Sequence, residues 1–150
     1  MRKAIDEAIN GVELHHGGPF GAIIEMDGKI IGRGHNCVVI SKNPTAHAEM
    51  EAIRNACVHI GDFNLCGAVL YTTCYPCPMC LGAILWARIS KVYYCVTSDE
   101  AAKIRFDDEV FYRTMNDEEK LQQLLILDDK EKEKCLNVMA HFSEKFLDRY

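Results

Sequence analysis

Two short stretches of the sequence combine side chains that bind metal ions. CYPCPMC, residues 74–80, contains three cysteines in two overlapping CxxC spacings, and HAE, residues 47–49, places a histidine two positions before a glutamate. Thiolate sulfur and imidazole nitrogen are typical zinc ligands, and a catalytic zinc site keeps three protein ligands and one open position. Together the two stretches could provide such a site with a carboxylate beside it.

The second CxxC pair, Cys77 and Cys80, is better placed for metal binding than the first. Pro76 and Pro78 suit the start of a helix, where a missing N–H removes no intrahelical hydrogen bond. At this spacing both sulfurs project from one face of the first turn, where the helix N-terminus favours thiolates. Cys74 precedes the turn, at the end of a predicted strand, and we interpret it as a packing residue.

His47 is the best candidate for a third ligand because it lies at another predicted helix start. Thr45 is predicted to cap that helix, which places His47 in its first turn. In a regular helix Glu49 would point about 200° away from His47, but a residue at the helix entrance need not follow that rotation. His47 could then reach a metal and Glu49 a water molecule on it. Alone, either residue could be an ordinary surface or core residue.

The elements around these residues predict a single three-layer α/β/α domain spanning residues 1–150. Strands that alternate with helices across short connections place the active loops at strand ends. We expect a central mixed sheet of about five strands, with Asp27-Gly28 turning a hairpin, while residues 118–129 fit a helix or a strand equally. The predicted strands are 22–26, 29–36, 68–73 and 91–96, and the predicted helices are one around 4–9, then 46–57, 81–89 and 130–150.

Apolar residues at helical spacing predict the buried faces of three of these helices. The predicted stripes are Ala4, Ile5, Ala8 and Ile9 in the first helix, Met50, Ile53, Cys57 and Ile60 in the second, and Leu136, Met139, Phe142 and Phe146 in the last.

Composition favours a globular protein in a reducing compartment. A chain of 150 residues can bury a core without disulfides, so its eight cysteines indicate metal binding or catalysis. Residues 1–14 include three acidic residues and no continuous apolar stretch, so we expect no signal peptide, no membrane span and a cytoplasmic location. The net charge of −5 and the scattered basic residues disfavour a nucleic-acid partner and suit a small polar substrate.

HAE followed by PCPMC is similar to the H-x-E…P-C-x-x-C pattern of the zinc deaminases of nucleobases and nucleosides. Further segments between about residues 16 and 114 resemble, in order, the guanine deaminases of the cytidine-deaminase-like family. These segments are GGPFGA, the GHN of GRGHN, NPTAHAE, AIRNAC, LYTTC, PCPMCLGAI, WARISKVYY and RFDDEVFY. The rest of the chain matches loosely, although a terminal Tyr, here Tyr150, also occurs in that family.

The resemblance implies a zinc-dependent hydrolysis of guanine to xanthine and ammonia. One Zn²⁺ per subunit would be held by His47, Cys77 and Cys80, with water as the fourth ligand. Glu49 would accept a proton from the attacking water and return it first to the ring nitrogen and then to the leaving amine.

The resemblance also implies a set of substrate contacts. Asn36 would hydrogen-bond the purine, Phe20 would pack on its ring, and Asp108 would bind its amino group. Ala48 and Trp86 are further candidates. Each also has an ordinary explanation, as a turn residue, a core residue or a surface acid.

The family exchanges C-terminal segments within a homodimer, which here would involve residues from about 116 to 150. Tyr150 would then reach the active site of the neighbouring subunit. The chain departs from the family at Tyr75, where these deaminases commonly have Glu or a small polar residue near the pocket mouth.

Other functions stay open. The substrate could be guanosine, cytosine or a tRNA adenosine, although a tRNA deaminase should have a basic surface and a different segment in place of RFDDEVFY. A structural zinc module would use Cys74 as its fourth ligand and would not need Glu49. A thiol oxidoreductase would use CxxC without a metal.

Overall fold

A computed structural model describes residues 1–146, with side chains as far as residue 143. Its internal contacts divide the chain into two compact units, Met1–Tyr112 and Arg113–Tyr150. The first unit contains the sheet and all of the zinc-ligand candidates. The assignment of residues 1–150 to one deaminase domain stays a prediction.

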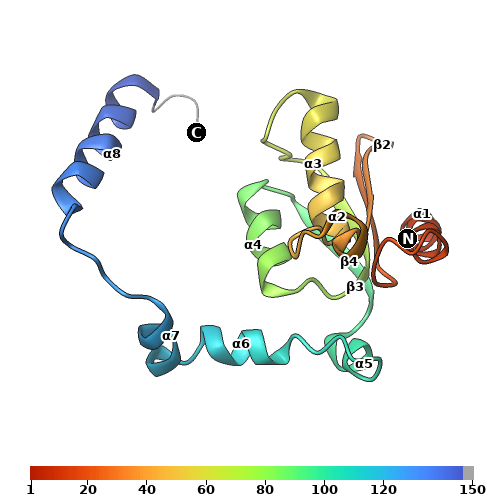
Figure 1. The fold of residues 1–150 in the computed structure, drawn as a ribbon. Helices are drawn as coiled ribbons and strands as arrows, with labels where there is room; N and C mark the ends of the chain where they lie inside the picture. Colours follow the sequence, from red (N-terminus) through yellow and green to blue (C-terminus); the bar gives the residue numbers. More distant parts are fainter. Residues whose placement is uncertain (147–150) are drawn as a thin grey trace. The chain divides into compact units, whose positions relative to one another are not determined.

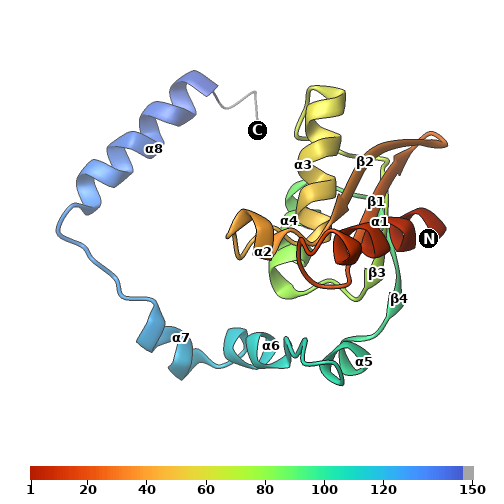
Figure 2. The same ribbon diagram turned by 45° about the vertical axis from the view of Figure 1, so that its right-hand side comes forward.

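The first unit is built on a mixed sheet with the strand order β2-β1-β3-β4 (Figure 1). β1 (Gly21–Met26) pairs antiparallel with both β2 (Lys29–His35) and β3 (Val69–Cys74), and β3 pairs parallel with β4 (Lys91–Val96). The predicted hairpin is present, with β1 and β2 paired as far as Met26 and Lys29 (Figure 2). Asp27 and Gly28 in its turn both have positive φ, 53° and 77°, as this type of turn requires.

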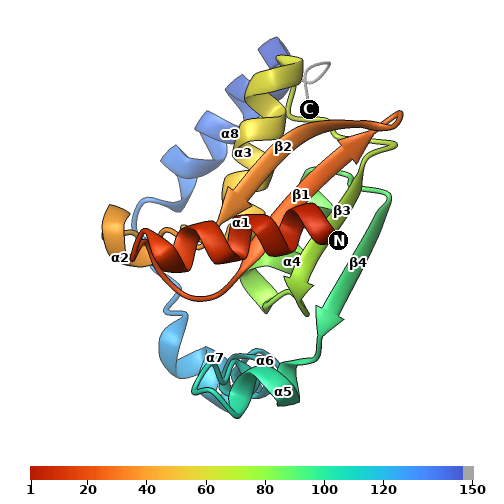
Figure 3. The same cartoon turned by 90° about the vertical axis from the view of Figure 1, so that its right-hand side faces the viewer.

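Helices cover both faces of this sheet, which confirms the three-layer α/β/α class. α1 (Arg2–Glu13) lies on one face, and α3 (Ala48–Ile60) and α4 (Pro78–Trp86) lie on the other (Figures 1 and 3). The expectation of about five strands is wrong for the described residues, which form four. Residues 118–129 were expected to form either a helix or a strand. They form the helix α7 (Glu118–Leu124), followed by a stretch without strand pairing.

Glycines in β2 allow α3 to approach the sheet closely. A Cβ atom on Gly34 would lie 2.3 Å from the carbonyl oxygen of Ala48, and one on Gly32 would lie 2.3 Å from that of Ala52. Side chains alternate across a strand, so the next residue, His35, faces the opposite side, where it meets Gly11 of α1. The backbone of β2 therefore sets how near the start of α3 lies to the sheet.

Two predicted helix faces differ from the buried ones. In α1, Ala4 and Ala8 are buried, but Ile5 and Ile9 are 42% and 56% exposed, because contact with the sheet selects the alanine side of the helix. α3 buries Ile53 together with small residues, and the other predicted stripe members are only partly buried. Its buried residues are Ala48, Glu49, Ala52, Ile53 and Ala56.

The remaining helices are short, apart from the predicted C-terminal one. α8 (Lys132–Phe146) is confirmed as a helix, and its predicted stripe is exposed within the described side chains, with Leu136, Met139 and Phe142 at 53%, 67% and 42%. Three helices were not predicted: α2 (Val38–Ser41), α5 (Ser98–Ala102) and α6 (Glu109–Met115). Among the described residues, no helix is long and apolar enough to cross a bilayer.

The glycine contact gives a first prediction. Gly34→Ala should lower the free energy of unfolding by about 1–3 kcal/mol, because the added methyl group has no space against α3. Gly82, inside α4, has open space around its Cβ position, so Gly82→Ala should be neutral or stabilise by about 0.5–1 kcal/mol. Urea unfolding of both variants measures the difference. Equal stability of the two would contradict the close packing of α3 on β2.

Candidate active site

Three metal-binding side chains converge between the first turns of α3 and α4. The donor atoms of His47, Cys77 and Cys80 all lie within 4.8 Å of one another. His47 Nδ1 is 3.6 Å from Cys77 Sγ and 3.7 Å from Cys80 Sγ. These are the three ligands that the sequence indicated, although they lie more than 30 positions apart at their extremes.

Each helix start presents one ligand from the residue just before the regular helix, and Cys80 follows inside the first turn of α4. His47 is itself the N-cap of α3, with extended φ and ψ of −73° and 159°, and Cys77 is the N-cap of α4, with −65° and 167°. Pro78 is the first helical residue of α4, as its type predicts. The prediction that Thr45 caps α3 is wrong, because its hydroxyl donates instead to Asn43 Oδ1 at 2.8 Å.

The spacing of the donors fits a tetrahedral metal ion. With metal–nitrogen and metal–sulfur bonds of about 2.05 and 2.3 Å, tetrahedral angles separate N and S ligands by about 3.6 Å. The two N···S distances of 3.6 and 3.7 Å agree with this value without any movement of the side chains. The set of one imidazole and two thiolates is also a zinc donor set that leaves a fourth position open.

Hydrogen bonds set the protonation of the two cysteines. A hydrogen bond with Cys80, helped by one with His47, lowers the pKa of Cys77 to about 4 although burial opposes the shift. The same contact with Cys77, together with burial, raises the pKa of Cys80. The lowered pKa favours the thiolate form of Cys77, which is the form that binds metals.

Glu49 is buried next to the ligands. Its Oε1 accepts a hydrogen bond of 2.7 Å from the Thr72 hydroxyl of β3, and its Oε2 lies 3.5 Å from Cys80 Sγ. The side chain is 6% exposed, and burial raises the pKa of its carboxyl, while the hydrogen bond from Thr72 lowers it. A carboxylate held in this way can accept and return a proton beside the metal position.

Cys74 is not part of the donor group. Among the described residues, the two clusters of potential metal ligands are His47 with Cys77 and Cys80, and a separate one near β2; Cys74 is in neither. It is buried at the end of β3, and burial, then Glu49, raise the pKa of its thiol to about 11. The first CxxC spacing therefore does not supply a fourth protein ligand.

The loop after α1 is fixed by Asn36, one of the predicted substrate contacts. Asn36 is 5% exposed, and its Oδ1 accepts hydrogen bonds from the backbone N–H groups of Gly18 and Val38, at 3.1 and 3.2 Å. Its own N–H donates to the carbonyl oxygen of Phe20 at 3.0 Å. The ring of Phe20 packs edge-on against Phe106, with centroids 4.7 Å apart.

Two further predicted contacts lie next to the ligands. Ala48 is fully buried between His47 and Glu49 at the start of α3. Asp108 precedes α6 and is partly buried. Burial, then the neighbouring Cys77, raise the pKa of its carboxyl, while His47 lowers it.

The structure does not bring Trp86 to this site. It is the last residue of α4, whereas Cys77 precedes the first, and a nine-residue helix is about 13 Å long. It is 73% exposed, so it is not a core residue within this chain, and its role as a substrate contact stays a prediction. Tyr150 lies outside the described residues.

Sequence reasoning missed three side chains around the site. Thr72 bonds Glu49, Phe106 packs on Phe20, and Tyr112 donates its hydroxyl proton to the Pro76 carbonyl oxygen at 2.8 Å. The ring centroids of Tyr112 and Tyr75 are 6.5 Å apart, with the rings tilted. The ring of Tyr75 packs edge-on against Tyr94. The alternation of VLYTTC could have indicated that Thr72 points inward, because it shares a face with the buried Leu70.

Comparison with known proteins is consistent with this geometry. Residues 1–96 match the family model of the cytidine and deoxycytidylate deaminase zinc-binding region. Guanine deaminase of Bacillus subtilis (strain 168) is 48% identical over 116 residues, 77% of this chain and 74% of that protein. The X-ray structure of guanine deaminase from Bacillus subtilis superposes with a TM-score of 0.89 and 42% identity, covering 96% of this chain and 93% of that one.

A second solved structure comes from work on A-to-I editing by tRNA:A34 deaminases. It superposes with a TM-score of 0.62 and 41% identity and covers 65% of this chain and 74% of that one.

The donor geometry predicts which cysteine holds zinc. Cys77→Ser should reduce bound zinc by one equivalent relative to the unmodified chain, because a neutral hydroxyl is a much weaker ligand than a thiolate. The matched variant Cys74→Ser should keep its zinc, because Cys74 lies outside the donor group. Metal analysis after dialysis measures both. Loss of zinc from Cys74→Ser as well would indicate a four-ligand structural site.

Proposed function

The chain belongs to the cytidine and deoxycytidylate deaminase family of zinc-binding proteins, and from this premise we propose that it hydrolyses guanine to xanthine and ammonia. The observation that carries the proposal is the agreement with a guanine deaminase structure over 96% of the chain at a TM-score of 0.89. The tRNA deaminase structure leaves about a third of the chain unmatched. The agreement with the guanine deaminase therefore includes much of the chain after β4, where Asp108 lies.

His47, Cys77 and Cys80 would hold one Zn²⁺ per subunit, since their donor spacing fits it. Zinc supplies a Lewis acid that lowers the pKa of a water molecule in its open position, so that a nucleophile is available near neutral pH.

Glu49 would move the protons. As oxygen from water bonds to C2 of guanine, Glu49 takes the proton that the water releases and delivers it to the adjacent ring nitrogen. Glu49 then passes the proton of the hydroxyl group on C2 to the amino group. The bond between C2 and the amino nitrogen breaks, and ammonia leaves. Thr72 holds Oε1 by its 2.7 Å hydrogen bond, which fixes the carboxylate plane through these transfers.

Asn36 would distinguish purines by the hydrogen bonds that it has left. Its Oδ1 already accepts two backbone hydrogen bonds, which use both lone pairs, so only the Nδ2 donors remain. The Nδ2 atom of Asn36 donates to no protein acceptor in the described part of the chain. Among the described residues, no fully buried side-chain nitrogen or oxygen lacks a hydrogen-bond partner, so Nδ2 must be accessible to solvent and therefore to a ligand. A donor suits the O6 and N7 acceptors of guanine and opposes the N6 amino group of adenine.

The other substrate contacts would complete the pocket. Phe20, supported by Phe106, would pack on the purine ring, Asp108 would bind its amino group, and Ala48 would line the wall beside the metal. The net charge of −5 also suits a small base better than a polyanionic tRNA. A structural zinc module is disfavoured for two reasons. Cys74 stays outside the donor group, so a fourth protein ligand is not supplied by it, and a carboxylate that such a module would not need, Glu49, lies beside Cys80.

The carboxylate gives a direct test of this function. Glu49→Gln should lower kcat for ammonia release from guanine at least about 1,000-fold, because the amide cannot accept the proton from water. Zinc content should remain that of the unmodified chain, since Glu49 is not a ligand. Coupled measurement of ammonia and metal analysis on the same samples provide both readings. Normal turnover by this variant would remove Glu49 from the mechanism.

A substrate panel separates the competing deaminases. Guanine, guanosine, adenine, cytosine and a tRNA anticodon stem-loop should be compared at equal concentration with the unmodified chain. We expect ammonia release from guanine to exceed that from every other compound. Faster release from the stem-loop would favour a tRNA deaminase, and release from none of them by a zinc-loaded protein would favour a structural module.

We further propose that the protein is a cytoplasmic homodimer that acts in guanine catabolism, with residues from about 116 to 150 exchanged between subunits. All eight cysteines, which lie within the described residues, are free, as expected in a reducing compartment. Large apolar side chains are exposed on α4 and from the last residue of α7 onward, which suits burial against another chain. They are Leu85, Trp86, Leu124, Leu125, Ile126 and Leu127, each at least 67% exposed.

Exchange of the C-terminal segment predicts complementation between two inactive variants. A chain that ends at Phe146 lacks Tyr150, whereas Glu49→Gln has a complete terminus but no proton carrier. Coexpressed in equal amounts, they should recover roughly a quarter of the normal activity, because half of the randomly formed dimers have one complete site. Each variant alone should be inactive. If both homodimers are inactive and the mixture is too, the terminus acts on its own subunit.

A further inference from the structure

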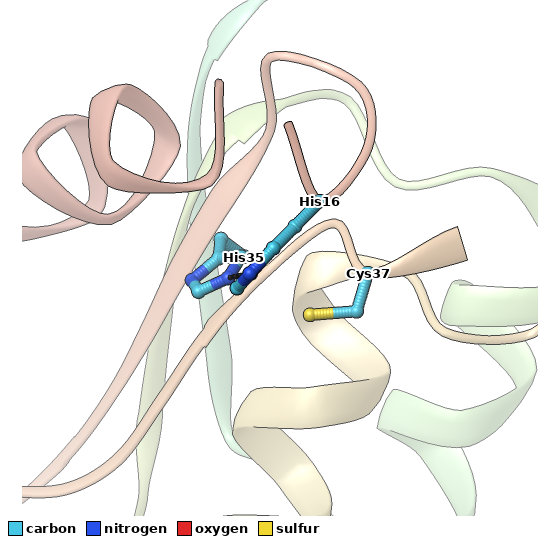
Figure 4. Close-up of side chains that lie close together, drawn as sticks. All are labelled: His16, His35 and Cys37. Atoms are coloured by element: carbon cyan, nitrogen blue, oxygen red, sulfur yellow. Dashed lines mark hydrogen bonds between the residues drawn. The ribbon is translucent and has the colours of Figure 1, made fainter. Parts of the chain in front are cut away.

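A second cluster of metal-binding side chains lies on the first unit, outside the proposed active site. The donor atoms of His16, His35 and Cys37 all lie within 4.8 Å of one another. His16 Nδ1 is 2.8 Å from His35 Nε2, and the two rings stack with centroids 5.1 Å apart. Figure 4 shows the thiol of Cys37 pointing toward these rings. The three residues come from the loop after α1, the end of β2 and the residue before α2.

A carboxylate lies behind His35, on the side of the ring away from His16 Nδ1. Glu7 of α1 places Oε2 3.4 Å from His35 Nδ1, and its other oxygen lies 3.5 Å from Arg33 Nη1. In the tautomer that donates Nδ1–H to Glu7, Nε2 is the acceptor nitrogen, and it faces His16 and Cys37. Histidines that bind metals almost always donate their second N–H to a carboxylate, a carbonyl or water, which makes the ligand more basic.

We propose that His16, His35 and Cys37 form a second metal site, which takes a divalent ion of the zinc class. Two imidazoles and one thiolate suit Zn²⁺ or Co²⁺ and disfavour Mg²⁺ and Ca²⁺, which prefer oxygen ligands. Tetrahedral coordination separates two nitrogen ligands by about 3.3 Å, so the two histidine rings need to part by only about half an ångström. The three side chains are partly buried, and the fourth position would be taken by water.

The site would fasten the segments that hold the proposed substrate contacts. Asn36 lies between His35 and Cys37, and its side chain already binds the loop that follows His16 through Gly18. The carbonyl oxygen of His16 accepts hydrogen bonds from the N–H groups of Val39 and Ile40 in α2. A metal ion here would therefore add a link between the loop after α1 and the continuous segment from the end of β2 to α2, which already meet through these hydrogen bonds and the stacked histidine rings. The inference concerns a site separate from the proposed function and does not depend on it.

Matched substitutions test the site by counting metal ions. After equilibration with a small excess of Zn²⁺ and removal of free metal, the unmodified chain should retain two equivalents. Cys37→Ser and His16→Asn should each retain one. The controls are Cys66→Ser, an exposed thiol, and His15→Asn, the exposed neighbour of His16, and both should retain two. His15 has φ of 57°, a conformation that Asn tolerates well.

Cobalt identifies the ligands independently of enzyme activity. Co²⁺ added to protein that already holds one Zn²⁺ should give a near-ultraviolet sulfur-to-cobalt absorption band, which Cys37→Ser should lose and Cys66→Ser should keep. Glu7→Gln should weaken binding of the second ion about 10–100-fold without lowering its saturating stoichiometry, because Glu7 only orients His35. One equivalent of zinc in the unmodified chain, or a second equivalent that persists in both Cys37→Ser and His16→Asn, would overturn the proposal and leave a hydrogen-bonded histidine pair.

Discussion

The hydrogen bond from Thr72 to Glu49 is the contact on which the geometry of the site depends. An ionised carboxylate that is almost fully buried is strongly unfavourable unless it is hydrogen-bonded. The Thr72 hydroxyl provides that bond at 2.7 Å and joins β3 to the first turn of α3. Because β3 also leads into Cys77, this contact ties the position of the carboxylate to that of the two cysteines. A site of this kind cannot be assembled from either helix alone.

The distance between α3 and the sheet is set by backbone packing of α3 against β2. Gly34 leaves the space in which the Ala48 carbonyl rests against β2, and Ala48 lies between the candidate ligand His47 and Glu49. A larger residue at Gly34 would move the start of α3 away from the sheet, and with it His47. The N···S distances already match tetrahedral coordination, so the protein holds this arrangement through packing that does not involve the ligands themselves.

Local features of the site and its three metal-ligand candidates were predictable, whereas the supporting contacts between distant segments were not. The prolines around Cys77 determine a helix start by their own geometry, and Asp27-Gly28 determines a hairpin turn. The cap of α3 was mispredicted because Asn43, two residues away, takes the Thr45 hydroxyl and leaves His47 as the N-cap. The partnership of Thr72 with Glu49 spans 23 positions, and no periodicity within either segment reveals it. The exposure of Ile5 likewise depends on which side of α1 meets the sheet.

In the proposed function, Asn36 would connect the fold to the choice of substrate. Its Oδ1 is committed to the backbone of Gly18 and Val38, so the amide cannot turn over to present an acceptor without breaking two hydrogen bonds. The only polar group left for a ligand is a donor, which favours a base with a carbonyl oxygen and an unprotonated ring nitrogen on the facing edge. Discrimination between guanine and adenine would then follow from a bond that the loop needs in order to fold. If Asn36 contacts the base as proposed, a mutation there that changed substrate preference would also loosen the loop that carries Phe20.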